Sequence, residues 1–230
     1  MSVALVTGCG NPQGLGLAIA DALEARGHTV ARHVAPGQAA RAPSFEADLA
    51  DPLAPELLLE HVTAALGPVS ILVNNAAHSS TDGHAALDAA TIDAHLAVNV
   101  RAPMLLSTLV ARGEEPPPPA RIVNLVSGQF LGPMPGELAY TASKGALEAF
   151  TRQLAAEVAH LGITVNAVGP GPNDTGWIDD DLRAELAPKF PAGRVGTPAD
   201  VAPLVAWLCS DEAAWVTGQV IHAEGGFQRR

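Results

Sequence analysis

The chain has 230 residues, of which 48% are hydrophobic, and its formal net charge is −11. That length can enclose one sizeable core, so we expect a single domain over residues 1–230. The acidic balance and the absence of a basic cluster disfavour nucleic acids and membranes as partners. Two distant cysteines without metal-type spacing, and no evident signal peptide, predict no metal site and a cytoplasmic location.

A glycine-rich turn follows the first predicted strand. Residues 3–6 form a short apolar run, residues 7–16 contain four glycines, and helical periodicity begins at Leu15. Glycines allow close backbone approach, and a helix N-terminus offers free N–H groups to a pyrophosphate. The turn therefore predicts a nucleotide site, with a purely structural turn as the alternative.

The second predicted strand, residues 28–33, ends at Arg32 and His33. In dinucleotide folds the residue at this end meets the adenosine ribose, where an acid selects NAD and a base favours the 2′-phosphate of NADP. Arg32 therefore favours NADP, unless it points into solvent. Residues 35–44 are too short and too rich in proline and glycine for a crossover helix, which predicts an open adenosine end.

Polar residues follow the next two predicted strands, residues 45–47 and 69–73. Asp48 follows the first, and Asn74-Asn75 follows the second, at the sheet edge where ligands bind in open α/β folds. Asn75 could orient a cofactor or simply form a turn. A long helix over residues 92–111 then carries Asn99 in its interior, which suggests a specific hydrogen bond.

A fifth strand, residues 121–126, ends at Ser127 and leads to a helix that begins near Tyr140. Tyr140 and Lys144 are four residues apart and therefore share a helix face. A fixed ammonium favours the phenolate and brings its pKa, ordinarily about 10, toward neutrality. The pair predicts acid–base chemistry, although a lone Tyr-x-x-x-Lys is often only a surface pair.

The remaining sequence continues the alternation of strands and helices. A sixth strand covers residues 163–168, a short segment at about 173–191 is expected to form a substrate lid, and a seventh strand covers residues 218–222. This order predicts a Rossmann-type, doubly wound α/β fold with a seven-stranded parallel sheet and helices on both faces, in three layers.

With these motifs in order from end to end, the chain resembles the short-chain dehydrogenase/reductase family in its single-domain form. The resemblance implies an NAD(P)-dependent oxidoreductase that interconverts an alcohol and a ketone or aldehyde. It implies that Ser127 bonds the substrate oxygen, Tyr140 transfers a proton to it, Lys144 binds the ribose and lowers the tyrosine pKa, and Asn99 positions a water. The implied cofactor-binding set is Gly8, Asn11, Gly14, Leu15, Gly16, Arg32, Asp48, Leu49, Asn75, Ala76, Tyr140, Lys144, Pro170, Gly171 and Thr175. The glycine loop is two residues longer than is usual in the family.

Substrate and assembly are less constrained. Residues expected at the pocket edge suggest a small or medium, uncharged substrate, although the apolar ones could equally be core or interface residues; they are Gln129, Phe130, Met134, Asn173, Trp177 and Asp179 to Asp181. The family resemblance implies a homodimer or homotetramer. Two alternatives remain open, namely a non-redox dehydratase or cyclase on the same fold, and a nucleotide-binding regulatory protein.

Overall fold

The computed structural model describes residues 2–113, 119–128 and 131–227. Within them, seven strands form one sheet in the order β3-β2-β1-β4-β5-β6-β7, and each neighbouring pair is parallel. The strands are β1 Val3–Val6, β2 Thr29–Val34, β3 Ser44–Glu46, β4 Val69–Asn74, β5 Arg121–Leu125, β6 Thr164–Gly169 and β7 Val220–His222. The predicted fold class is confirmed.

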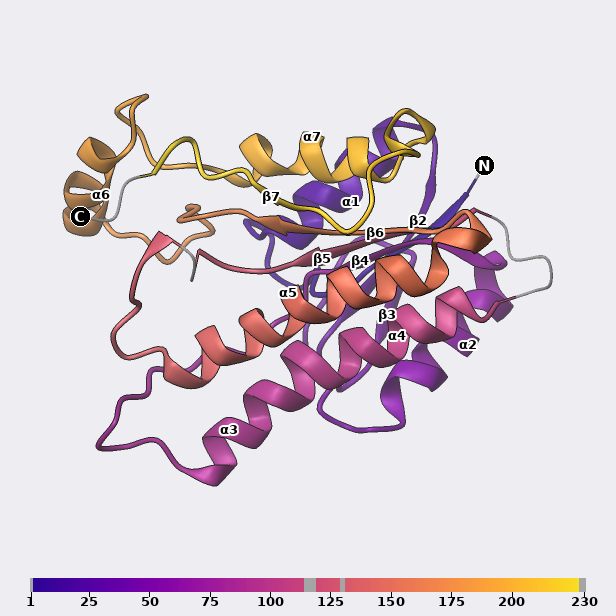
Figure 1. Ribbon diagram of the computed structural model, residues 1–230, viewed down its shortest axis with the longest axis horizontal. Helices are drawn as coiled ribbons and strands as arrows, with labels where there is room; N and C mark the ends of the chain where they lie inside the picture. Colours follow the sequence, from indigo (N-terminus) through magenta and orange to yellow (C-terminus); the bar gives the residue numbers. More distant parts are fainter. Residues whose placement is uncertain (1, 114–118, 129–130, 228–230) are drawn as a thin grey trace.

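Helices cover both faces of the sheet and make three layers (Figure 1). One face carries α1 (Leu15–Ala25) and α7 (Pro198–Leu208), and the other carries α2 (Ala54–Leu66), α4 (Ala102–Ala111) and α5 (Leu138–Val158). Further helical segments are α3 Ala89–Leu96, the π-helix η1 Ala97–Arg101, α6 Asp180–Leu186, and the short 3₁₀ turns η3 Ala159–Leu161, η4 Ala187–Lys189 and η5 Asp211–Ala213.

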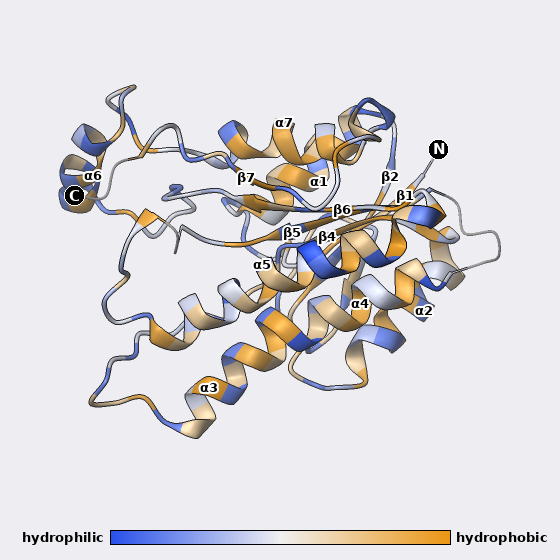
Figure 2. Ribbon diagram, viewed as in Figure 1, coloured by the Kyte–Doolittle hydropathy of each residue, from blue (hydrophilic) through white to orange (hydrophobic). Residues whose placement is uncertain are grey.

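Alternate residues of each central strand enter opposite cores. Leu5 and Leu72 pack with the helices α2, α4 and α5, whereas Ala4 and Ile71 pack with α1 and α7. Because both faces are covered, the strands are nearly continuous apolar runs, and they are orange in Figure 2. The two cysteines are free and buried, and burial raises the pKa of each thiol to about 12, so neither is a reactive group.

The strand order reverses between β1 and β4, and this switch point lies at the centre of the sheet. Chain segments that follow the carboxyl ends of the strands gather at one end of the molecule, where α6 also lies (Figure 1). Ligands of doubly wound folds bind at such a switch point. The fold therefore brings the glycine loop, the β4 end and the start of α5 to one place.

The connection from β2 to β3 contains no helix, as predicted. A Cβ atom added to Gly10 would lie 2.0 Å from Oε1 of Gln38. The Gln38 side chain therefore folds back against the glycine loop. A turn across residues 35–38 carries this side chain, and residues 36–39 are exposed, so the openness of the adenosine end stays a prediction.

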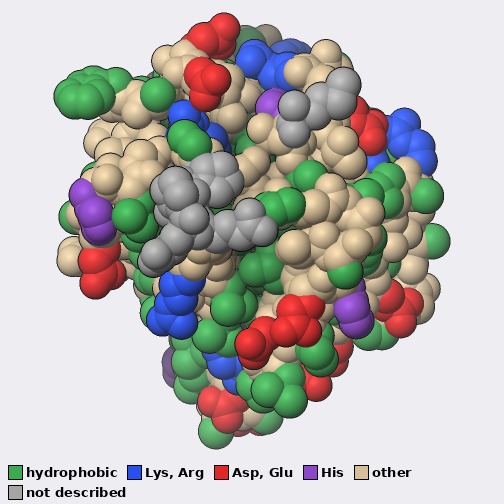
Figure 3. Space-filling model, turned by 90° about the vertical axis from the view of Figure 1, so that its right-hand side faces the viewer, with side chains coloured by type: hydrophobic (Ala, Val, Ile, Leu, Met, Phe, Trp, Pro, Cys, Tyr) green, Lys and Arg blue, Asp and Glu red, His purple; other side chains and the backbone are tan. Residues whose placement is uncertain are grey.

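The helical stretch Ala89–Ala111 is long and apolar enough to cross a membrane by length and composition. Half of its most apolar window is buried within the molecule, and it packs against α5 and β4. It therefore packs as a core helix of the domain. On the opposite end face from α6, acidic and basic side chains are interspersed (Figure 3).

Candidate active site

Helix α5 carries the predicted acid–base pair, and a distant loop holds its first turn. The two carboxylate oxygens of Asp82 accept hydrogen bonds from the Leu138 and Ala139 N–H groups, at 2.6 and 2.8 Å. The Asp82 N–H donates to the Gly136 carbonyl at 2.7 Å. Asp82 is buried and thus caps the helix end that presents Tyr140. Sequence analysis missed this residue.

Tyr140, Lys144 and Ser127 converge beside the end of β5. The Lys144 Nζ lies 5.7 Å from the Tyr140 ring centroid and donates to the Leu125 carbonyl at 2.8 Å. Burial raises the pKa of Tyr140, a hydrogen bond with Ser127 lowers it, and the Glu137 carboxylate raises it. Burial also lowers the pKa of Lys144 to about 8. In this structure burial, rather than the lysine charge, dominates the tyrosine pKa, contrary to expectation.

Asn99 lies in the π-helix η1 and joins two parts of the site. Its Oδ1 accepts from the His78 N–H at 2.7 Å, and its Nδ2 donates to the His78 carbonyl and to Ser143 Oγ, both at 2.9 Å. Ser143 Oγ in turn donates to the Tyr140 carbonyl at 2.7 Å. The predicted specific hydrogen bond is present. Because both Nδ2 hydrogens are engaged, the Asn99 side chain positions α5 against the segment after β4.

The glycine loop provides a cradle that fits a pyrophosphate. Gly8 has φ +75°, and an added Cβ there would lie 2.8 Å from the Ala76 Cα. A Cβ on Gly16 would lie 2.3 Å from the Gly8 carbonyl oxygen. Gly14 is the N-cap of α1 and supplies no side-chain acceptor, which leaves N–H groups of the first turn for an anion. Leu15 follows Gly14 and lines the cavity above Tyr140.

Arg32 lies elsewhere than predicted. Its side chain is fully buried, and its Nη2 lies 2.8 Å from Glu24 and 3.5 Å from Asp21, both on α1. An arginine committed to this pair neither points into solvent nor extends toward a ribose. The side chain that meets the loop is His33, whose Nδ1 accepts from the Gly8 N–H at 3.1 Å.

His33 bridges the glycine loop and β3. Its Nε2 is 3.0 Å from the Ala47 carbonyl, so the neutral tautomer that donates from Nε2 satisfies both contacts. Burial lowers the pKa of His33, in agreement with a neutral ring. A buried, neutral imidazole therefore lies near the end of β2. The sequence pattern did not assign a structural role to His33.

The other proposed cofactor residues divide between structural and exposed positions. Asn75 Nδ2 donates to the Thr7 and Gly8 carbonyls at 2.8 and 3.1 Å, so it fixes the glycine loop to the β4 end beside Ala76. Leu49 is buried in the core, whereas Asp48 is exposed and accepts from the Ala50 N–H. The carboxyl ends of β3 and β4 therefore lie at the same edge of the sheet.

The two extra residues of the glycine loop bring it to the lid. Asn11 Nδ2 donates to the Thr175 carbonyl at 3.0 Å, and a Cβ on Gly176 would lie 2.3 Å from Gln13 Oε1. Pro170, Gly171 and Thr175 line the cavity above Tyr140. The longer loop thus contacts the segment expected to flank the nicotinamide.

The cavity above Tyr140 has a volume of about 740 Å³. Ser127 and Tyr140 share its lining with Met134 and Trp177, and the lining also includes Asn173. Gln129 and Phe130 lie outside the described residues. Asp179, Asp180 and Asp181 belong to the lid but not to this lining.

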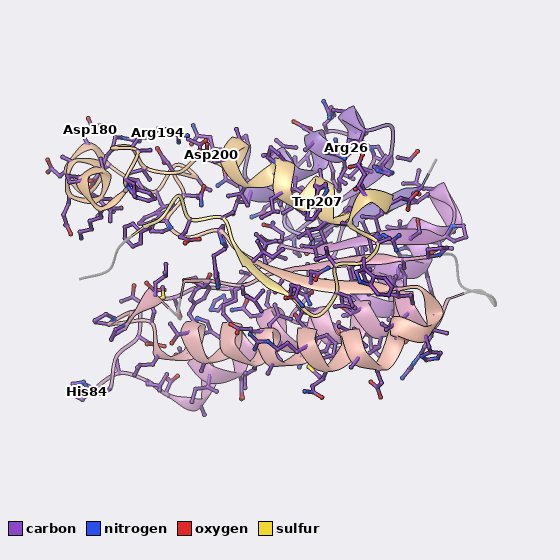
Figure 4. All side chains as sticks on the ribbon, turned by 45° about the horizontal axis from the view of Figure 1, so that its top comes forward. Arg26, His84, Asp180, Arg194, Asp200 and Trp207 are labelled. Carbon is purple, nitrogen blue, oxygen red and sulfur yellow. The ribbon has the colours of Figure 1, made fainter. Side chains whose placement is uncertain are left out.

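The segment at about 173–191, which we expect to form a substrate lid, consists of a loop, α6 and η4. Its interior is an apolar cluster that includes Ile178, Leu186 and Phe190. At its base Arg194 makes a bidentate ion pair with Asp200, at 2.6 and 2.7 Å. Figure 4 shows this pair at the root of the lid and Asp180 at its outer end.

Comparisons with known proteins show which family this chain resembles over its whole length. A family model described as "Enoyl-(Acyl carrier protein) reductase" matches residues 8–228. The "Uncharacterized oxidoreductase YjdA" of Bacillus subtilis is 46% identical, over 99% of this chain and 97% of its own. The 3-oxoacyl-[acyl-carrier-protein] reductase FabG of Escherichia coli is 35% identical, over 97% of this chain and 96% of its own.

Solved structures give the same picture. The angucycline C-6 ketoreductase LanV, solved with bound NADP, superposes with a TM-score of 0.88 at 32% identity, over 98% of this chain and 95% of its own. The reductase LugOII, described as catalysing keto-reduction at C1 during lugdunomycin biosynthesis, has a TM-score of 0.88 at 34% identity, over 98% and 96% of the two chains.

Proposed function

Because the chain belongs to the short-chain dehydrogenase/reductase family of NAD(P)-dependent oxidoreductases, we propose that it interconverts a small or medium, uncharged ketone or aldehyde and its alcohol. The observation that carries this proposal is the convergence of Ser127 and Tyr140 on one cavity, with Lys144 beside them. A glycine cradle next to the cavity supports a dinucleotide there.

The protein and the cofactor would have different roles in the reaction. A bound nicotinamide supplies or accepts the hydride, and the protein supplies positioning and proton transfer. In reduction, the Ser127 and Tyr140 hydroxyls donate hydrogen bonds to the carbonyl oxygen, and Tyr140 gives its proton to the developing alkoxide. In oxidation the phenolate removes the proton. Lys144 stays within 5.7 Å of the ring and offers positive charge below its pKa of about 8.

NADP(H) is the cofactor that we favour. LanV is solved with NADP, and a metagenomic blue fluorescent protein that is 31% identical is solved with NADPH. In this chain the neutral His33 lies near the end of β2, where a carboxylate would repel a 2′-phosphate. The support does not come from Arg32, which is held by Glu24.

The lid argues for a free small molecule over a substrate tethered to an acidic carrier protein. Residues 173–191 contain five carboxylates and two cations. Both cations are in ion pairs, Arg183 with Asp174 at 2.6 Å and Lys189 with Glu185 at 2.8 Å. An acidic partner would meet a negative surface at the entrance.

The two alternatives make different demands on the residues. A regulatory protein does not need the acid–base group, yet Ser127, Tyr140 and Lys144 are all present and converge. A dehydratase or cyclase would use Tyr140 without net hydride transfer, so the amount of cofactor oxidised per product separates it from a reductase.

The test is a spectrophotometric search for carbonyl-dependent NADPH oxidation, with Tyr140→Phe as the diagnostic variant. We expect Tyr140→Phe to lower kcat by about 10²–10⁴-fold, because general acid catalysis is lost, while the NADPH dissociation constant stays within about twofold. Product formation without NADPH consumption, or full activity of Tyr140→Phe, would contradict the proposed function.

We also propose that the protein is a cytoplasmic homodimer or homotetramer. The exposed apolar residues Ile92, Leu96, Met104 and Leu105 lie along α3 and α4, beside α5. An apolar stripe of this kind along the helical stretch Ala89–Ala111 favours burial against a second copy.

A further inference from the structure

Trp177 is a large apolar side chain that is both exposed and part of the cavity. Its relative exposure is 58%, yet it lines the same cavity as Ser127 and Tyr140. It lies on the loop between β6 and α6, at the sheet end where α5 begins (Figure 1). Exposing an indole costs hydrophobic free energy that a ligand could recover.

The indole is held in place by its one polar atom. Nε1 of Trp177 donates to the Asn173 carbonyl at 2.9 Å. Asn173 is buried, and its own Nδ2 donates to the Pro170 and Gly171 carbonyls. The next residue, Ile178, is buried in the lid cluster. Because the N–H is satisfied within the loop, the ring is a preorganised apolar surface and not a donor that waits for a partner.

The rest of the cavity entrance is also apolar on its lid side, where Leu182, Leu186 and Phe227 join the lining. Of the described residues that line the cavity, two are charged, Glu137 and Lys189. Lys189 is already paired with Glu185 at 2.8 Å. The entrance therefore lacks a free cation for an anionic substrate, and it suits a flat neutral group.

From this arrangement we propose that Trp177 is a specificity-determining residue that stacks on an aromatic ring of the substrate, and that the substrate class is aryl or ring-fused aromatic ketones and their alcohols. This inference rests on the proposed function, since it names the substrate class of the same site. An aromatic ring offers an indole more contact and better electrostatics than an alkyl group of similar size.

The experiment compares two ketones that differ by a fused benzene ring, 2-tetralone and cyclohexanone. We expect Trp177→Ala to lower kcat/KM for 2-tetralone about tenfold, mainly through KM, and to change that for cyclohexanone less than about twofold. Trp177→Phe keeps an aromatic face and should retain most of the preference. Trp215→Ala is the matched control, because Trp215 is 99% exposed and does not line the cavity.

The outcomes separate this inference from the proposed function. Equal losses on both ketones would indicate a structural role for Trp177 and would contradict the inference, as would no loss on either. If the parent enzyme prefers cyclohexanone and Trp177→Ala has the same kcat/KM values as the parent, the role of Trp177 is contradicted. The proposed function would still stand. If the parent binds NADPH, measured by its fluorescence, but oxidises it with no carbonyl compound, the proposed function fails and the inference fails with it.

Discussion

Groups with opposing effects set the protonation of Tyr140. Burial and the Glu137 carboxylate raise the pKa of Tyr140, whereas the hydrogen bond with Ser127 lowers it. Lys144 is close, but its own pKa falls to about 8 because it is buried. Sequence analysis identified Tyr140 and Lys144 from their spacing, but it predicted a lowered tyrosine pKa, the wrong sign, because burial and the position of the Glu137 charge depend on how the surrounding loops fold.

Glu137→Gln should move the pH profile of alcohol oxidation to lower pH. The substitution removes a negative charge that raises the Tyr140 pKa, so the phenolate that acts as base forms at lower pH. The measurement is kcat against pH for the parent and the variant. Glu157→Gln, an exposed position near the far end of the same helix, is the control and should leave the profile unchanged. An unshifted rising limb in Glu137→Gln would contradict the electrostatic role.

At the scale of elements, the catalytic helix depends on a cap from another part of the chain. The N-cap position of α5 is Glu137, whose side chain makes no capping hydrogen bond, and Asp82 supplies the acceptors. A pattern search looks for a cap immediately before the helix and so cannot find Asp82, which is more than fifty residues earlier. The π-helix η1 was missed for a similar reason, because one extra residue in a turn hardly alters apolar periodicity.

Asp82→Ala should destabilise the protein by about 1 kcal/mol and lower kcat, because α5 loses two N-terminal acceptors close to Tyr140. Asp82→Asn retains one acceptor oxygen and should lose less of both. Denaturant unfolding and steady-state kinetics, run on the same preparations, measure the two effects. A stable Asp82→Ala protein with the kcat of the parent would show that the cap has no bearing on the site.

The glycine cradle gives a second prediction for an element. Gly16→Ala would place a Cβ 2.3 Å from the Gly8 carbonyl oxygen, so it should cost about 1–3 kcal/mol of stability and weaken NADPH binding at least tenfold. Gly145→Ala is the matched control, because its Cβ would meet nothing within 4 Å and alanine favours a helix by about 0.5–1 kcal/mol. Thermal unfolding and cofactor titration distinguish the pair. Unimpaired NADPH binding in Gly16→Ala would show that the glycine cradle does not hold the cofactor.

At the scale of the whole molecule, the order of strands and helices was predictable because most strands are short, mainly apolar runs that alternate with helical periods. All seven predicted strands are present, with ends that differ by at most two residues. The fate of Arg32 was not predictable, because its partners Asp21 and Glu24 lie on a different element, and only the packing of α1 on β2 brings them together. The direction of a side chain at a strand end depends on how the neighbouring elements pack.

The exposed stripe on α3 and α4 yields the last prediction. Ile92 and Leu96 are four residues apart and so share a face of α3, and Met104, which is 39% exposed, continues the exposed apolar surface on α4. In Figure 2 orange bands alternate with blue and pale ones along this stretch. Met104→Lys should place a charge in the proposed subunit interface and shift the protein toward monomer at micromolar concentration, as measured by sedimentation. Leu57→Lys is the control, since Leu57 is 49% exposed on α2, outside the stripe. If the mass of Met104→Lys equals that of an oligomeric parent, the subunit contact lies elsewhere. If the parent is a monomer, the proposed subunit contact does not exist.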